Sequence, residues 1–507
     1  MAFVSPGVYW RELDFSDYVP NLSTSILGLV GGATWGPMDD DTLITNEGDL
    51  TRVFGFPTKD DMGLHAAIRY LRRGTQLRYC RVGTASAAKS SVMVQDGSSD
   101  DVFEIEAIYH GSRGDNVQVV LANGATAGRY NLAVSTVIDP YGTRQDVELF
   151  EDLSLDDPTD ERYIETTVNE GTRDFPASVY IRIDVIDGSL TPSIGTYTLT
   201  GGDDGITGLT ASDYIGVTVG QTATGLQVFA NPERVDVNMI AVPGVSDPAV
   251  VLEELEVCEK KRKDAFAIID PPFGLTVDGV IDWHNGAAPY THASFNNSYG
   301  TLFWPWIQIY DPYTRSELWT PPCGFVAEAT AYTDFIAEPW YAIAGLNRGR
   351  VSALRTEYSP DQGQRDALYG NQNAVNPIVS FPRDGIALYG QRTLQRRPSA
   401  LDRLNVRRLL LTIEKQIATA VKYLVFEPHD PITWRRFENL VEPAMDYVKS
   451  RRGVYDFRVI CDETTNPPIV IDRSEMYGKV LLKPTKAAEM IIIDFTLLAT
   501  GADFTEF

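Results

Sequence analysis

The sequence predicts a multidomain protein of mixed α+β and α/β class, in which an α/β core carries an inserted β-rich domain and an extended arm at each terminus. Three observations predict this class. Apolar runs of strand length alternate with amphipathic helical segments on both sides of residues 95–205. Within 95–205, short β-type runs alternate with turn signals. Both termini carry strand-like apolar patterns, and the 507 residues correspond to about three domains.

The first segment, residues 1–22, is predicted to be an N-terminal arm that contains a strand. Val8 and Trp10 alternate with Tyr9 and Arg11, which is the period of a half-buried strand. Pro6 prevents ladder pairing just before this strand. Chain ends usually fray unless a partner holds them, so an apolar strand here requires a sheet to pair with.

The α/β core is assigned to residues 23–94 plus 206–345. An apolar strand at 25–30 is followed by a short helix at 64–73 and a strand at 76–82. After the insertion, a strand at 235–243 ends in a Pro-Gly turn, and a helix and a second apolar strand follow it. This alternation is typical of α/β architecture.

Residues 95–205 are predicted to form an outward-facing β-sandwich or small barrel. Asn123-Gly124, Asp187-Gly188 and Gly201-Gly202 separate its β-type runs. The runs lie at 102–108, 116–121, 130–137, 179–185 and 195–199. From Asp96 to Asp204 there are 22 Asp/Glu, six Arg and no Lys, a net charge of −16. Such a concentration of charge indicates an exterior surface.

Residues 346–483 are predicted to form a C-terminal domain around a long helix. The helix presents an apolar stripe that consists of Leu410, Ile413, Ile417, Val421 and Leu424. Arg408, Lys415 and Lys422 are spaced by seven, which places them roughly opposite that stripe, and Arg407 adjoins them. Such a basic stripe is either a solvated face or a contact surface. From Arg383 to Lys422 there are nine Lys/Arg and three Asp/Glu, on a chain whose net charge is −25.

Residues 484–507 are predicted to be a C-terminal arm with a strand. Met490, Ile491, Ile492 and Ile493 form a continuous apolar run, and Phe495 follows it. The partner sheet for this strand lies either in the same molecule or in a neighbouring copy. The second possibility would make the protein an assembly subunit.

Several functional classes lack support in the sequence. No apolar stretch is long enough for a transmembrane helix, no secretory signal is visible, and the net charge of −25 argues against nucleic-acid binding. The four cysteines are far apart, and no HExxH or G-x-S-x-G motif occurs. We therefore predict no catalytic residue, no metal site and no cofactor.

The order and spacing of several short motifs resemble the contractile tail sheath proteins of bacteriophages. The matching runs are SPGVY at 5–9 followed by Glu12, GGATWGP at 31–37, LTGGDDG at 199–205, NPI at 376–378, GQRTL at 390–394, NVRRL at 405–409 and VFEP at 425–428. The matching motifs are spread over most of the chain outside 95–200, and the acidic β-region resembles the variable outer insertion of that family.

The resemblance implies a non-enzymatic subunit that stacks as hexameric rings around a tail tube and contracts to drive the tube through a bacterial envelope. It implies that the strands with Val8, Tyr9 and Trp10 and with Met490–Ile493 and Phe495 pair with sheets of neighbouring subunits. It implies that residues 346–483 form an inner domain that faces the tube, and it makes Arg407, Arg408, Lys415 and Lys422 candidate contacts to the tail tube protein. Baseplate and tail terminator proteins are the further expected partners, without direct nucleic-acid contact or membrane insertion. The expected location is the virion tail, assembled in the host bacterial cytoplasm.

Three alternatives stay open at this point. The sheath could belong to a phage-like contractile injection particle. The chain could be an α/β hydrolase with a β insertion that uses Asp203 and Asp204. It could also be a surface adhesin that uses the acidic β-region and the tripeptide Arg113-Gly114-Asp115.

Overall fold

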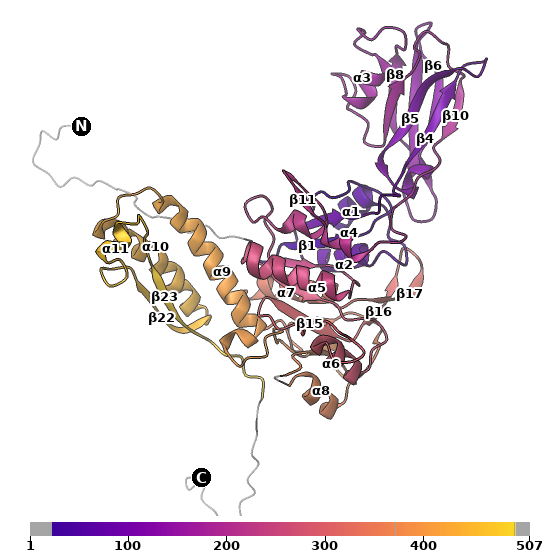
Figure 1. The fold of residues 1–507 in the computed structure, drawn as a ribbon. Coiled ribbons are helices and arrows are strands. Elements are labelled where there is room, and N and C mark those ends of the chain that lie inside the picture. Colours follow the sequence, from indigo (N-terminus) through magenta and orange to yellow (C-terminus); the bar gives the residue numbers. More distant parts are fainter. Residues whose placement is uncertain (1–22, 371, 491, 493–507) are drawn as a thin grey trace, which may run out of the picture. The chain divides into compact units, whose positions relative to one another are not determined.

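The chain folds as two compact units, Met1–Val425 and Phe426–Phe507 (Figure 1). The computed structural model describes residues 23–370, 372–490 and 492. Helices and strands occur in both units, in several separate sheets, so the predicted multidomain α+β class is confirmed. Among the described helices, none combines the length and the apolar composition needed to span a bilayer.

A mixed sheet of nine strands organises the first unit, in the order β18-β21-β20-β15-β14-β13-β1-β3-β2. Its strands are β1 (Leu27–Gly31), β2 (Thr42–Ile44), β3 (Leu77–Arg81), β13 (Met239–Ala241), β14 (Phe266–Ile269), β15 (Gly300–Trp304), β18 (Arg350–Val351), β20 (Asn376–Phe381) and β21 (Gly385–Leu388). Neighbours from β3 to β20 run parallel, whereas β2, β21 and β18 pair antiparallel. The central strands are buried along their whole length because both faces of the sheet are covered.

Each face of this sheet packs against its own set of helices. On β14, Phe266 and Ile268 point into one hydrophobic core and Ala267 and Ile269 into the other, as the period of two requires. The first core includes side chains of α1 (Glu47–Phe54), α2 (Met62–Leu71), α7 (Cys323–Ile336) and α9 (Leu404–Val421). The second includes side chains of α5 (Pro248–Glu256), α6 (Val277–Asn285) and α8 (Gln362–Leu368).

The nine-stranded sheet contains strands from both sides of 345/346, the predicted boundary between the core and the C-terminal domain. β15 pairs with β20 in parallel, and β20 and β18 both pair with β21, so strands on either side of 345/346 share one sheet. We therefore place residues 350–388 with the α/β core. The division between the two compact units falls after Val425.

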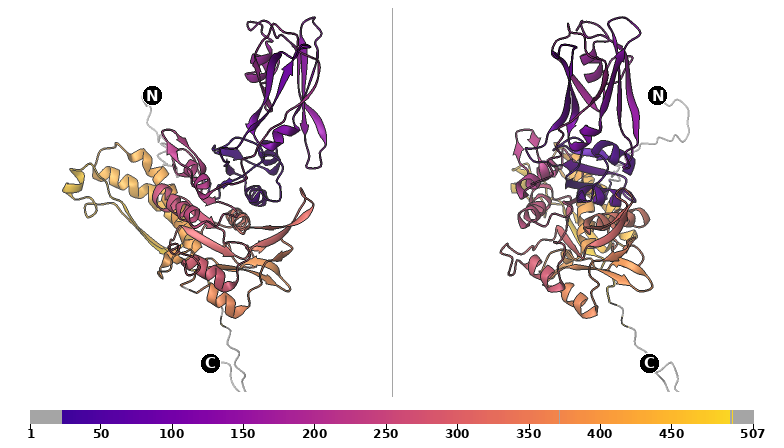
Figure 2. Two further views of the ribbon diagram at one scale, coloured as in Figure 1. Left: turned by 45° about the vertical axis from the view of Figure 1, so that its right-hand side comes forward. Right: turned by 90° about the vertical axis from the view of Figure 1, so that its right-hand side faces the viewer.

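The acidic insertion is built from two sheets that enclose a third hydrophobic core (Figure 2). One sheet holds β4 (Lys89–Gln95), β5 (Asp101–His110) and β9 (Ile181–Val185), and the other holds β6 (Gln118–Asn123), β7 (Tyr130–Val137), β8 (Arg144–Leu153) and β10 (Gly195–Thr198). The five runs predicted from the sequence fall on β5, β6, β7, β9 and β10. β4 and β8 were not predicted from the sequence, and in β8 charged and polar residues interrupt the apolar alternation.

Short elements complete the first unit. They are η1 (Ser112–Asn116), α3 (Ile164–Asn169), α4 (Ala211–Ile215), β11 (Thr218–Val219), β12 (Thr222–Ala223), η2 (Gly225–Phe229), the π-helix η3 (Val257–Arg262), β16 (Ile307–Asp311), β17 (Ser316–Thr320), β19 (Arg355–Thr356), η4 (Ala400–Asp402) and η5 (Lys422–Leu424). β16 pairs with β17 and with β19 in a three-stranded sheet, and β11 and β12 form a separate hairpin.

The burial of α9 differs from the single apolar stripe predicted for it. Ile413 and Leu424 are buried, but Leu410, Ile417 and Val421 are only half-buried. The first half of the helix is buried on nearly all sides, and its buried residues include Leu404, Val406, Leu409 and Leu411. A helix enclosed in this way loses the simple two-faced pattern on which the prediction depends.

The described residues of the second unit form two helices and a two-stranded antiparallel sheet. Its elements are α10 (Pro431–Ser450), β22 (Val454–Ile460), α11 (Pro468–Ile471) and β23 (Lys479–Pro484). The side chain of Asp430 caps α10 by accepting hydrogen bonds from the backbone N–H groups of Ile432 and Thr433. Glu438 on α10 accepts a bond of 2.9 Å from the backbone N–H of Cys461, which follows β22.

Candidate functional site

Two predicted residues of the C-terminal arm strand lie within the described residues. Met490 is 87% exposed and Ile492 is 85% exposed, and neither belongs to a helix or strand. The other predicted arm residues, which are Val8, Tyr9, Trp10, Ile491, Ile493 and Phe495, lie outside the described residues. Burying large apolar side chains with this exposure against a partner is energetically favourable, because it removes their surface from water.

The sheet of β22 and β23 has the properties of an acceptor for an added strand. In the described part of the chain each of its two strands pairs only with the other, so each has one unpaired edge. An isolated two-stranded sheet is marginally stable in water. This sheet was not predicted from the sequence, although the short apolar run of Val480, Leu481 and Leu482 between two lysines is a strand-length signal that could have shown β23.

The exposed side of this sheet is basic. Arg458, Lys479 and Lys483 are exposed on it. Asp456 is the acidic side chain among them, and it accepts a bond of 2.9 Å from Lys449 and lies 3.9 Å from Lys483. By contrast, residues 489–507 contain four Asp/Glu and no Lys or Arg. The charges of the arm and of the sheet are therefore complementary.

Two of the four candidate tube contacts are buried inside the first unit. The Arg408 guanidinium lies 2.5 Å from Asp334, which also accepts a bond of 2.7 Å from the Thr24 hydroxyl. Only 3% of the Arg408 side chain is exposed. Arg407 is also buried, and its guanidinium stacks 3.4 Å from the ring centroid of Tyr299.

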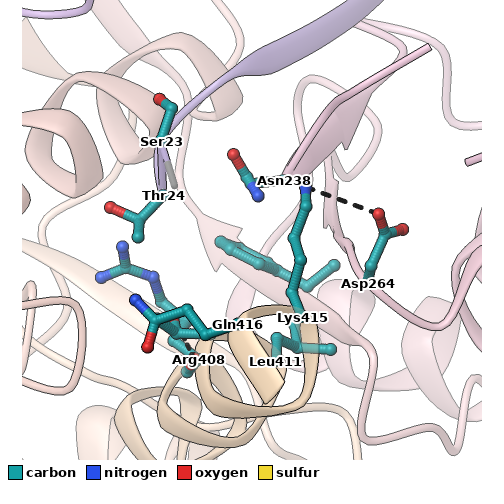
Figure 3. A pocket seen from close by; sticks show the side chains of 10 residues that line it. Ser23, Thr24, Asn238, Asp264, Arg408, Leu411, Lys415 and Gln416 are labelled. Atoms are coloured by element: carbon teal, nitrogen blue, oxygen red, sulfur yellow. Dashed lines mark hydrogen bonds and ion pairs between the residues drawn. The ribbon is translucent and has the colours of Figure 1, made fainter. Parts of the chain in front are cut away.

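The other two candidate tube contacts, Lys415 and Lys422, differ in whether their side chains have a partner in the unit. Lys415 pairs with Asp236 and lies 3.5 Å from Asp264, beside a small pocket under α9 (Figure 3). Lys422 is exposed at the end of α9. Acidic and aromatic groups of the same unit therefore enclose Arg407, Arg408 and Lys415, whereas Lys422 is exposed, and the contact of these residues with a tube stays a prediction.

The carboxylates of the hydrolase alternative hold the base of the insertion in place. Asp204 accepts hydrogen bonds from the backbone N–H and the hydroxyl of Ser112, at 2.5 and 3.0 Å. Asp203 accepts a bond of 2.8 Å from the backbone N–H of Gly205. Arg81 donates to the backbone oxygens of Asp204 and His110. These contacts give both aspartates a structural role.

The tripeptide of the adhesin alternative is part of the same junction. It lies in η1, where Arg113 donates at 2.8 Å to the backbone oxygen of Thr51 and stacks on Phe56. Asp115 accepts bonds from the Ser90 hydroxyl and from the backbone N–H of Gly202, at 2.7 and 2.9 Å. Both charged side chains are therefore engaged within the chain, because Arg113 joins the insertion to α1 of the core and Asp115 bonds within the insertion.

The cysteines and His284, whose side-chain types act in the active sites of many enzymes, are buried in this structure. All four cysteines are free and buried, and burial raises the pKa of the Cys461 thiol to about 11. Burial lowers the pKa of His284 to about 3, so this imidazole is neutral at physiological pH. In the described ranges, no group of three or more His, Cys, Asp and Glu side chains is arranged to hold a metal ion.

A buried carboxyl pair lies at the carboxyl end of β14. Asp270 accepts bonds from the backbone N–H groups of Cys323 and Gly244, at 2.9 and 3.1 Å. Burial raises its pKa to about 6 despite these bonds. Burial and the nearby Asp270 also raise the pKa of Glu254 well above its usual range. Asp270 thus fixes the start of α7 at the edge of the sheet.

Comparisons with known proteins match this chain to one family. The phage tail sheath protein central domain matches residues 207–394, and the phage tail sheath C-terminal domain matches residues 396–497. The tail sheath protein of Vibrio phage KVP40 is 32% identical over 350 residues, which are 65% of this chain and half of that relative's length. The tail sheath protein of Enterobacteria phage T4 is 25% identical, and the alignment covers 100% of this chain and 99% of the T4 protein.

Solved structures share the fold at low sequence identity. A sheath tail protein from Listeria innocua has a TM-score of 0.61 at 12% identity, covering 92% of this chain and 96% of its own. The contracted sheath of an extracellular contractile injection system has a TM-score of 0.58 at 16% identity, covering 100% and 99%. The contracted helical sheath of the anti-feeding prophage has a TM-score of 0.55 at 15% identity, covering 98% and 99%.

The ion pair of Arg408 predicts that α9 tolerates charge reversal at one end only. Arg408→Glu should lower the free energy of unfolding by about 3–5 kcal/mol, because it buries a second carboxylate against Asp334. Lys422→Glu should change that energy by less than about 0.5 kcal/mol, because Lys422 is exposed. Urea denaturation of the unassembled variants measures both values. Equal losses would contradict the burial described for Arg408.

The raised pKa of Asp270 predicts a stability change with pH. The folded protein keeps this carboxyl protonated up to about pH 6, while the unfolded chain releases the proton near its ordinary value of 3.8. Stability from this group is therefore greatest below pH 4 and falls by about 3 kcal/mol as the pH rises to 7. In urea denaturation, the free energy of unfolding of Asp270→Asn, taken relative to that of the wild type, should rise by this amount between pH 4 and pH 7. If the free energies of unfolding of the two proteins change in parallel with pH, this prediction is refuted.

Proposed function

Because the chain belongs to the phage tail sheath family, we propose that it is the polymerising subunit of a contractile tail sheath. In this proposal the subunits stack as hexameric rings around a tail tube. Contraction of the stack drives the tube through the bacterial cell envelope during genome delivery. The observation that carries the proposal is the pair of family matches, which together extend from residue 207 to residue 497.

A phage-like contractile injection particle is the second candidate for the assembly to which this sheath belongs. The likeness to the sheath of an extracellular contractile injection system favours it, and that likeness concerns the fold alone. The T4 and KVP40 relatives favour a phage tail. Both candidates give the chain the same structural role, and the family is a structural one rather than an enzymatic one.

The arms are proposed to join neighbouring subunits by adding strands to the β22–β23 sheet. Met490 and Ile492 are exposed in the single chain, and burying each would contribute about 1.5–3 kcal/mol. The unpaired edges of β22 and β23 supply backbone groups for the new ladder. The acidic arm would meet the basic side of that sheet, formed by Arg458, Lys479 and Lys483. Such a joint would persist while the subunits rotate during contraction.

The tube contact is proposed to include Lys422. Of the four basic candidates it is the exposed one within the described residues, since Arg407, Arg408 and Lys415 have partners inside the unit. An exposed ion pair is worth about 0.2–1 kcal/mol, so many such contacts could hold a tube and release it together.

The remaining partners and the location follow from the same role. A sheath of this kind would meet a baseplate at one end and a tail terminator at the other. It would be assembled in the cytoplasm of the host bacterium and function in the tail of the virion. The contraction energy would come from new contacts between subunits as the rings close up.

Electron microscopy of the purified protein tests the proposal. A sheath subunit should form long hollow helical tubes, and added salt should promote them by screening the repulsion between acidic copies. A protein that stays monomeric at every salt concentration would contradict the proposal.

Deleting residues 489–507 tests the strand exchange separately. The truncated chain should remain folded, because the described residues 489, 490 and 492 are exposed and lie outside every helix and strand. It should remain monomeric where the wild type polymerises, which sedimentation and microscopy can measure together. A matched control replaces Met490 and Ile492 with Val, which keeps the strand pattern and should preserve the tubes. Normal tubes from the truncated chain would exclude the exchange.

A further inference from the structure

We propose that the β11–β12 hairpin, defined as residues 217–224, is a contact through which one copy of this chain touches a second copy. The inference rests on the sheath polymer proposed above and assigns it a surface that is separate from the terminal arms. β11 is labelled in Figure 1, where the hairpin projects from its unit.

The hairpin exposes apolar side chains on a segment without charge. Val217 is 60% exposed and Val219 is 72% exposed. From Val217 to Ala230 the sequence contains no Asp, Glu, Lys or Arg, whereas 22% of the whole chain is charged. An exposed, uncharged and β-branched hairpin is a template for contact with another protein surface.

The two sides of the hairpin differ at β12, where Thr222 is exposed and Ala223 is half-buried, while both residues of β11 are exposed. Thr218 lies opposite Ala223, and Ala223 packs against the second hydrophobic core. Val219 lies opposite Thr222, and both are exposed. Because neighbouring residues of a strand face opposite sides, Val217, Val219 and Thr222 share the outward side.

The base of the hairpin holds it in a fixed conformation. Gly216 and Gly225 have φ angles of 68° and 53°, and a Cβ atom at Gly216 would lie 1.9 Å from the backbone oxygen of Thr224. The backbone N–H of Val217 donates to the Thr224 hydroxyl at 2.9 Å, and the Arg234 guanidinium donates to the backbone oxygen of Gln221 at 2.7 Å. The valines are thus held outward before any partner arrives, which lowers the entropy lost on contact.

The sheath polymer proposed above makes a second copy the occupant, and the net charge favours an uncharged surface for that contact. Two copies that each carry −25 repel one another, so their contacts are least costly where the surface is uncharged. Leu149 on β8 shows the contrast, because it is 55% exposed but Glu148 and Glu151 flank it in the sequence. The β11–β12 hairpin combines exposed apolar side chains with freedom from such flanking carboxylates.

Charged substitutions on the hairpin test the inference. Val217→Asp and Val219→Asp should leave the thermal unfolding of the unassembled chain unchanged, because both side chains are exposed. Each should raise the protein concentration needed for tube formation by about tenfold. The deficit should shrink as salt rises, since ionic screening weakens the added repulsion. The matched control is Leu149→Asp, which adds the same charge at a similar exposure and should polymerise like the wild type.

The outcomes separate this inference from the proposed function. If the wild type forms tubes and Val219→Asp forms them at the same concentration, the hairpin contact is refuted and the sheath role stands. If Leu149→Asp loses assembly as strongly, net charge alone explains the loss, and the contact is refuted again. A wild type that forms no tubes refutes the sheath role and the contact with it.

Discussion

Like-charge repulsion is the constraint under which any contact between copies of this chain has to form. Its net charge is −25, and the stretch from Asp96 to Asp204 alone carries −16. A polymer of such subunits therefore needs contact surfaces that are uncharged or of opposite charge. The β11–β12 hairpin meets the first condition and the basic side of the β22–β23 sheet meets the second, since Arg458, Lys479 and Lys483 are exposed there. The proposed hairpin contact would avoid the repulsion through an uncharged surface, and the proposed arm exchange would offset it through opposite charges.

Several basic side chains form ion pairs inside the first unit and so are not available for contacts between copies. Arg408 pairs with Asp334, and Lys415 pairs with Asp236 beside Asp264, which ties α9 to the body of the first unit. The fully buried side chain of Arg262 also pairs with Asp264, and its guanidinium donates to the backbone oxygens of Phe229 and Val235. Removing one member of a buried pair would leave the other charge unpaired at a cost of several kcal/mol. These side chains therefore act in the fold, and Lys422 is the member of the predicted stripe that is free to act at the surface.

Sequence reasoning succeeds where a local pattern decides the structure and fails where distant contacts do. The runs on β5, β6, β7, β9 and β10 follow from apolar alternation and turn residues, and the mixed class follows from the alternation of strands and helices. The spacing of Arg408 and Lys415 does place them on one side of a helix. However, their acidic partners lie 74 to 179 residues away in the sequence, so their burial could not be read from the helix itself. Pairing of β15 with β20 is non-local in the same way, which is why the boundary at 345/346 divides a continuous sheet.

Cysteine cross-linking between differently tagged copies tests the strand exchange most directly. The four native cysteines are buried, so cysteines introduced at Ile492 in one copy and at Leu481 in another would react selectively. A short bismaleimide should link the two tagged chains once they are assembled, and it should leave them separate at concentrations below assembly. The contradicting result comes from one chain that carries both substitutions. If that chain forms an internal link as a monomer and the mixed copies form none, the C-terminal arm folds back on its own unit and does not join neighbouring subunits.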